Sequence, residues 1–179
     1  MSATTGPTRE QQDAHFMELA LRQAEAAVSR GQTPFGAVVV NRDGCLIGEG
    51  HNTVRADHDP TAHGEVVAIR DAWRRTGALQ MLAGATLYTS CEPCLLCSYV
   101  ITQIGISRVV FAARGTDVPT YKPLLGAGMA AAAAWVNAQA DWPPLEVVGD
   151  FMRERALKII AAFPWTQVQA RTDARDPGR

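Results

Sequence analysis

Two short segments of the sequence carry side chains that bind transition metals. His63 and Glu65 stand two positions apart, and Cys94 and Cys97 form a Cys-x-x-Cys pair further along the chain. One imidazole and two thiolates supply three zinc ligands, which leaves the fourth tetrahedral position for water. Zinc lowers the pKa of a bound water to about 7 and so provides hydroxide at neutral pH. Glu65 lies close enough to His63 to move protons at such a site without binding the metal.

Each segment alone is a weak signal, and other chemistries use the same residues. His-x-Glu occurs by chance, and Cys-x-x-Cys is also typical of redox pairs and of half a structural zinc site. Cys91 precedes the pair at iron–sulfur spacing, but a fourth cysteine followed by proline is missing. Cys45 alone does not complete a structural site. Together the two segments predict one catalytic Zn²⁺ per chain, with Cys91 buried and inert. A structural zinc or redox module is the non-enzymatic alternative.

Both segments are expected at the beginning of helices, predicted over residues 62–75 and 93–104. The partial positive charge at a helix N-terminus helps to keep thiolates deprotonated and stabilises a bound hydroxide. Further helices are predicted at 10–30, 129–140 and 151–163, and strands at 35–40, 45–49, 85–89, 108–113 and 145–148. This alternation predicts an α/β fold, a three-layer α/β/α sandwich with a central mixed five-stranded sheet.

Length and composition are those of one globular domain. The chain has 179 residues, of which 47% are hydrophobic and 20% charged. We place the domain at residues 10–165, between flexible tails at 1–9 and 166–179. The net charge of −1 is unlike that of a protein built to grip nucleic acid. Arg153, Arg155 and Lys158 are expected to form a solvated helix face. Neither a signal peptide nor a membrane span is recognised, which predicts a cytoplasmic protein.

Over residues 10–165 the chain resembles the cytidine deaminase-like superfamily, whose signature combines His-x-Glu with Pro-Cys-x-x-Cys. The resemblance implies that His63, Cys94 and Cys97 bind the zinc ion and that Glu65 is the general acid and base. It also implies hydrolytic replacement of an exocyclic amino group on a nucleobase-type ring, and a homodimer. Gly64 stands where many members have alanine, a change expected to be tolerated.

Two branches of the superfamily are most similar. The bacterial guanine deaminases match residues 34–37, 59–63, 87–94 and Thr116-Asp117. The tRNA adenosine deaminases share residues 36–37, 92–94 and 108–111 but usually carry Ala-Arg-Asp where this chain has Ala-Arg-Gly. The Thr-Asp pair therefore favours hydrolysis of guanine to xanthine and ammonia. The alternatives are adenosine in tRNA and another small heterocycle or nucleoside, such as cytosine or guanosine. Residues 118–143 depart from both branches.

The resemblance also implies a set of substrate contacts. Phe35 would stack on the base, Asn52 would read its edge, and the backbone near Ala62 would help to hold it. Asp117 would act as a second carboxylate beside Glu65, accepting the N–H groups of guanine and helping to carry a proton to the departing ammonia. Core packing for Phe35, a turn for Asn52 and a solvated loop for Asp117 are the alternative interpretations.

Overall fold

The structure, a computed structural model, describes residues 6–119 and 128–166 and contains one five-stranded sheet in the order β2-β1-β3-β4-β5. Strand β1 runs antiparallel to both β2 and β3, whereas β3, β4 and β5 are parallel. The predicted mixed sheet is therefore confirmed. The strands are β1 (Gly36–Val40), β2 (Leu46–His51), β3 (Thr86–Cys91), β4 (Arg108–Ala113) and β5 (Glu146–Val148).

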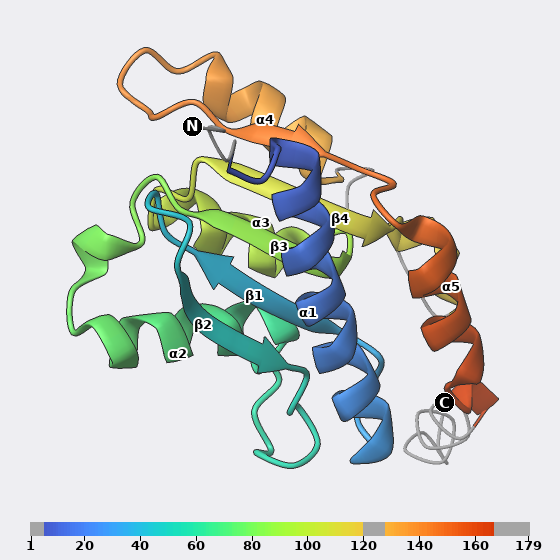
Figure 1. Cartoon of the computed structure of the whole chain (residues 1–179). Helices are drawn as coiled ribbons and strands as arrows, with labels where there is room; N and C mark the ends of the chain where they lie inside the picture. Colours follow the sequence, from blue (N-terminus) through green and yellow to red (C-terminus); the bar gives the residue numbers. More distant parts are fainter. Residues whose placement is uncertain (1–5, 120–127, 167–179) are drawn as a thin grey trace, which may run out of the picture.

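Helices cover both faces of this sheet, so the predicted three-layer sandwich is also confirmed (Figure 1). One face carries α1 (Arg9–Ser29) and α5 (Arg153–Ala162). The other face carries α2 (Gly64–Thr76), α3 (Leu95–Gln103) and α4 (Met129–Asn137). Two short 3-10 turns, η1 (Leu79–Met81) and η2 (Gly115–Asp117), lie in the connections.

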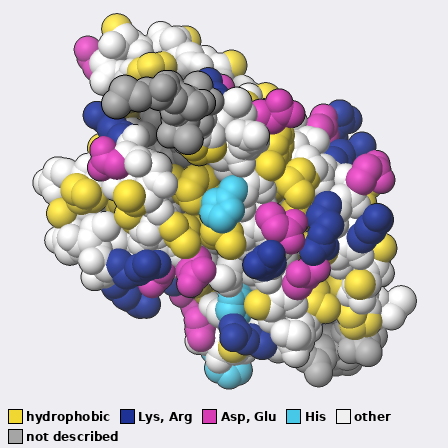
Figure 2. Space-filling model, in the orientation of Figure 1, with side chains coloured by type: hydrophobic (Ala, Val, Ile, Leu, Met, Phe, Trp, Pro, Cys, Tyr) yellow, Lys and Arg dark blue, Asp and Glu magenta, His cyan; other side chains and the backbone are white. Residues whose placement is uncertain are grey.

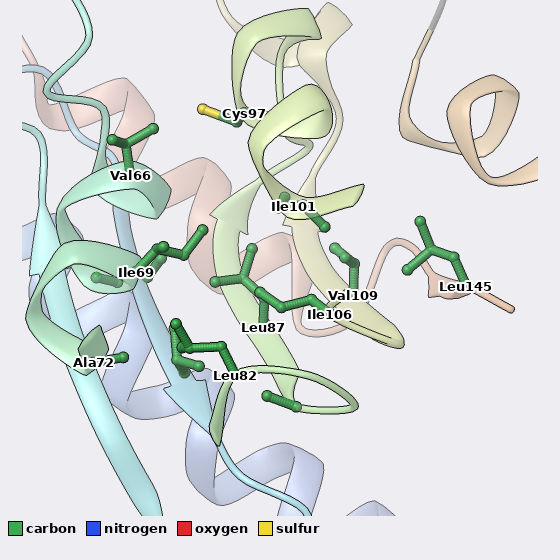
Figure 3. Packing of buried hydrophobic residues seen from close by; sticks show 14 of the residues in the cluster. Val66, Ile69, Ala72, Leu82, Leu87, Cys97, Ile101, Ile106, Val109 and Leu145 are labelled. Carbon is green, nitrogen blue, oxygen red and sulfur yellow. The ribbon is translucent and has the colours of Figure 1, made fainter. Parts of the chain in front are cut away.

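Alternate residues of the strands enter two separate apolar cores, as the period of two in a strand requires. Val39, Leu87 and Val109 pack against α2 and α3, and Figure 3 shows Leu87 and Val109 beside side chains of these helices. Tyr88 and Val110 point to the opposite core, under α1 and α5. A sheet covered on both faces explains why its strands read as nearly continuous apolar runs.

Two glycines of β2 allow α2 to lie directly on the sheet. A Cβ atom added at Gly48 would stand 2.4 Å from the carbonyl oxygen of Ala68, and one at Gly50 would stand 2.4 Å from the Ala68 nitrogen. Because backbone atoms cannot give way as a flexible side chain does, any larger residue would push α2 outwards. This close approach fixes where α2 begins, and therefore where His63 lies.

A buried ion pair fastens α1 to the sheet. Arg108 donates from Nη1 and Nη2 to the two carboxylate oxygens of Asp13 at 2.7 and 2.8 Å, and the Tyr88 hydroxyl donates to Asp13 at 2.7 Å. Burial acts to raise the pKa of Asp13, but the hydrogen bonds from Arg108 and Tyr88 outweigh it and hold the pKa below its usual value. The pair therefore stabilises the fold above the unfolded-state pKa and loses this contribution as the pH falls through the lower folded-state pKa.

Helix α1 begins at Arg9, inside the predicted tail, because Thr8 caps it with a capping box completed by Gln11. Helix α4 ends at Asn137, three residues before its predicted end at 140. Residues 120–127, part of the segment 118–143 that departs from both branches, lie outside the described ranges, as do residues 167–179 of the predicted C-terminal tail. None of the helices within 6–119 and 128–166 is long and apolar enough to cross a membrane.

Candidate metal centre

The two predicted metal-binding segments meet where α2 and α3 begin. His63 is the N-cap residue of α2, Cys94 is the N-cap residue of α3, and Cys97 lies in the first turn of α3. Both N-cap residues have extended backbone, with φ −70° and ψ 155° at His63 and φ −70° and ψ 173° at Cys94. Neither side chain makes a capping hydrogen bond to its own helix, so the imidazole and the thiol are free to face each other.

The spacing of the three donor atoms is that of a tetrahedral zinc site. His63 Nδ1 lies 3.4 Å from Cys94 Sγ and 3.5 Å from Cys97 Sγ, and the two sulfurs are 3.7 Å apart. Zinc bonds of about 2.3 Å to sulfur and about 2.0–2.1 Å to nitrogen give tetrahedral edges of about 3.8 Å between sulfurs and about 3.5 Å between sulfur and nitrogen. Within the described residues these three side chains form the whole ligand group. The predicted residues therefore fit a zinc ion with an open fourth position.

The chemistry of the donor set also suits a cation. The hydrogen bond with Cys97 lowers the pKa of Cys94 to about 4, and the same bond raises the pKa of the Cys97 thiol. The hydrogen bond with Cys94 raises the pKa of His63. A bound zinc ion removes the thiol proton of each cysteine that it coordinates.

Glu65 lies beside this group but is not one of its ligands. It is the second residue of α2 and only 6% exposed. Burial, followed by the neighbouring Cys94 thiolate, raises the pKa of Glu65 to about 7. A carboxyl group with this pKa can both take up and release a proton near neutral pH, as a general acid–base catalyst must.

Gly64 separates His63 from Glu65 at a point of close contact with the sheet. A Cβ atom added at Gly64 would lie 3.0 Å from the carbonyl oxygen of Phe35 and 3.2 Å from the Gly36 Cα atom. An alanine here would therefore need a shift of a few tenths of an ångström in the neighbouring backbone. The same contact places Phe35 next to the beginning of α2.

The predicted substrate contacts lie around that point. Phe35 is half-buried, and its carbonyl oxygen accepts the N–H of Asn52 at 2.8 Å. Asn52 is 5% exposed, and its Oδ1 accepts the N–H of Val54 at 3.3 Å. Ala62 is fully buried, and both of its backbone polar groups bond within the loop, to Thr53 and to Asp59. Contact of Phe35, Asn52 and the backbone near Ala62 with a substrate stays a prediction.

Asp117 is engaged in a way that the sequence did not indicate. Arg153 donates to both of its carboxylate oxygens, from Nε at 2.8 Å and from Nη2 at 2.5 Å, and the Arg114 N–H donates to Oδ2 at 2.8 Å. The hydrogen bonds from Arg153 lower the pKa of Asp117. The carboxylate is therefore paired with Arg153, and its contact with a substrate beside Glu65 stays a prediction. Arg153 is correspondingly not part of a solvated face.

One carboxylate near the metal centre received no role from the sequence. Glu92 stands two residues before Cys94, and its oxygens accept the N–H groups of Gly115 at 3.1 Å and Met129 at 2.9 Å. The sequence gives no local sign of these bonds, because both partners lie more than twenty residues away along the chain. The adjoining Pro93-Cys94 motif is the one signal that drew attention to this turn.

Comparison with known proteins agrees with this geometry. The sequence model for the "Cytidine and deoxycytidylate deaminase zinc-binding region" matches residues 10–113. The chain is 47% identical to the guanine deaminase of Bacillus subtilis over 103 residues, which cover 57% of this chain and just under two thirds, 65%, of that relative. It is 31% identical to the tRNA-specific adenosine deaminase of Buchnera aphidicola subsp. Schizaphis graminum over 154 residues, 84% of this chain and 93% of that relative.

A solved structure leads to the same assignment. A chain from work on A-to-I editing by tRNA:A34 deaminases superposes with a TM-score of 0.66 at 32% identity, and the match covers 82% of this chain and 99% of that one. The family match includes His63, Glu65, Cys94 and Cys97, the residues that the fold brings together at the beginning of α2 and α3. This chain therefore belongs to the cytidine and deoxycytidylate deaminase zinc-binding family.

Proposed function

We propose that this protein is a zinc-dependent hydrolase that deaminates a free purine, with guanine as its substrate and xanthine and ammonia as its products. The catalytic part of the proposal rests on the His63, Cys94 and Cys97 triangle with the buried Glu65 beside it. A closed structural zinc site needs neither an open fourth position nor an adjacent carboxylate of raised pKa. This combination disfavours the structural zinc or redox alternative.

A small substrate is favoured over nucleic acid because most of the described arginine side chains are already paired with carboxylates. The chain has 17 basic and 18 acidic side chains. On the face that Figure 2 shows, basic and acidic side chains are interspersed. Affinity for nucleic acid comes largely from unpaired cations that replace the counterions of phosphates. Most arginines of the described residues already pair with carboxylates: Arg9, Arg22, Arg70, Arg75, Arg108, Arg114, Arg153 and Arg155.

Each residue then has a defined part in the reaction. His63, Cys94 and Cys97 would hold the zinc ion, which when bound would lower the pKa of a water molecule and so supply the nucleophile. Glu65 takes one proton from the attacking water and delivers it to the ring nitrogen beside the carbon under attack, and it then moves the second proton from the new hydroxyl group on that carbon to the departing amino group. Phe35 stacks on the ring and Asn52 bonds to its edge. The water oxygen ends on the ring carbon, the carbon–nitrogen bond breaks, and nitrogen leaves as ammonia.

The direct test is ammonia release from guanine by the zinc-loaded protein, measured beside a tRNA anticodon stem-loop. We expect turnover of guanine and no change in the RNA. An inert guanine and a deaminated adenosine would move the protein to the tRNA branch, which is supported by the Buchnera relative aligned over 93% of its length. Cytosine and guanosine belong in the same screen, because they carry the same type of amino group.

The role of Asp117 is open to a paired test. If Asp117 reads guanine, Asp117→Asn should lower guanine turnover at least about tenfold, because a mismatched buried polar group discriminates strongly. Arg153→Met is the matched control, since it removes the partner and leaves the carboxylate. Equal losses in the two variants would show that Asp117 acts by anchoring α5, and the prediction of a substrate contact would then be wrong. Zinc content should be unchanged in both variants.

We further propose a homodimer that uses the exposed side of α3. Leu95, Leu96 and Tyr99 are 44%, 38% and 64% exposed and lie at i, i+1 and i+4 of the helix that carries Cys97. Large apolar side chains grouped in this way mark contact surfaces. Light scattering should show that Tyr99→Glu is a monomer. The same change at Trp135, which is 58% exposed on α4, should leave the protein a dimer. A dimeric Tyr99→Glu protein would refute this surface.

The two-thiolate centre also favours a reducing compartment. The four cysteines, of which Cys45 is exposed, are all free thiols in the structure. Oxidation would join Cys94 to Cys97 in a disulfide or couple either of them to another thiol, and either event would remove zinc ligands. We therefore place the protein in the cytoplasm.

A further inference from the structure

Glu92 joins three parts of the chain beside the metal centre. Its backbone N–H donates to the carbonyl of Ala113 at 2.8 Å, which holds the end of β3 against β4. Its Oε2 accepts the N–H of Gly115 at the beginning of η2, and its Oε1 accepts the N–H of Met129 at the beginning of α4. One side chain thus fastens two distant segments to the turn that leads into Cys94.

For α4 this carboxylate replaces the usual cap. The N-cap residue is Gly128, which has no side chain to accept the first free N–H groups of the helix. Glu92 supplies that acceptor from across the structure, and its negative charge is favourable at a helix N-terminus. Gly128 has an ordinary φ of −83°, so its backbone does not require glycine. A Cβ atom at Gly128 would stand 2.2 Å from Glu92 Oε1, so a larger residue here would displace the carboxylate.

The beginning of α4 in turn presses on the first turn of α3. Met129 is fully buried, and the hydroxyl of Ser98 lies 3.3 Å from its sulfur. Ser98 directly follows Cys97, and its backbone N–H donates to the Cys94 carbonyl at 2.8 Å. The same hydroxyl lies 3.3 Å from the Pro93 carbonyl. The contact therefore reaches the backbone on both sides of the two thiol ligands.

From these contacts we propose that Glu92 is a positioning residue of the metal centre. Its carboxylate holds α4 against the turn that carries Cys94 and Cys97, which keeps the two sulfurs at zinc spacing and slows the escape of the ion. The inference rests on the zinc centre of the proposed function. It assigns Glu92 no contact with metal or substrate. A glutamine cannot replace it fully, because one of the two N–H donors would then face an amide NH₂ group.

The test measures the release of zinc from the loaded protein to a chromogenic chelator. Glu92→Ala should release zinc about tenfold faster than the wild type, at the lower end of the effect seen when groups that support metal ligands are removed. Glu92→Gln should fall between the two. Gly128→Ala, which leaves the carboxylate in place but drives it away from the Met129 N–H, should also accelerate release. These two milder variants keep the test informative if Glu92→Ala does not fold.

Asn137→Ala is the matched control, because it loosens α4 at its far end. Asn137 donates to the Leu145 carbonyl at 3.0 Å and accepts the Leu145 N–H at 2.7 Å. Its loss should lower the melting temperature but leave zinc release within about twofold of the wild type. Equal acceleration in Asn137→Ala, or unchanged release in all the Glu92 and Gly128 variants, would overturn the proposal. A wild-type protein without zinc would instead contradict the proposed function.

Discussion

Replacing Glu65 by glutamine should abolish turnover while leaving the zinc content and the fold intact. Glutamine keeps the size of the buried side chain and one oxygen acceptor, but it cannot take up a proton. General acid–base groups contribute about 10²–10⁴-fold to rate, and a residue that handles several proton transfers belongs at or above the upper end. We therefore expect turnover to fall by about 10⁴-fold or more.

The measurement is the rate of ammonia release from guanine, with the zinc content determined on the same sample. Glu49→Gln makes the identical chemical change on β2, where the exposed carboxylate accepts a hydrogen bond from Gln23 at 3.0 Å. That control should retain nearly full activity. Activity of Glu65→Gln within about tenfold of the wild type would refute the catalytic role, and loss of zinc from it would mean that Glu65 supports the metal rather than the proton transfers.

The zinc ligands were predictable because each half of the site is local in sequence. His63 and the Cys94–Cys97 pair lie at positions where the chain enters a helix, and helix beginnings are marked by nearby polar and proline residues. The sandwich that brings the halves together was predictable from the alternation of helices and strands. Given these two features, the ligands of adjoining elements could meet at one end of the sheet.

The ion pairs were not predictable, because their partners are distant and share no pattern. Asp13 and Arg108 are 95 positions apart, and Asp117 and Arg153 are 36 apart. An arginine at the beginning of a helix looks like part of a solvated face until the packing of that helix is known. The role expected for Asp117 left out its ion pair for the same reason: the sequence shows that Asp117 is acidic but not that Arg153 is within reach.

Replacing Cys94 or Cys97 by serine should empty the metal centre and lower the stability of the whole domain. Zinc binds thiolates at neutral pH far better than it binds a serine hydroxyl, and binding free energy adds to folding free energy. At a free zinc concentration of about 1,000 times the Kd, binding adds about 4 kcal/mol to the free energy of unfolding. For a domain of this size such a loss lowers the melting temperature by about 8–16 °C.

The other two cysteines supply the matched controls. Cys91 is buried, and its sulfur lies 3.7 Å from the carbonyl oxygen of Arg114. Cys45 is exposed in the β1–β2 hairpin. Cys91→Ser and Cys45→Ser should retain close to one zinc per chain. A chelator should lower the melting temperature of the wild type towards that of Cys94→Ser and leave Cys94→Ser itself unchanged. Full zinc in Cys94→Ser, with zinc lost from Cys91→Ser, would instead place Cys91 in the ligand set.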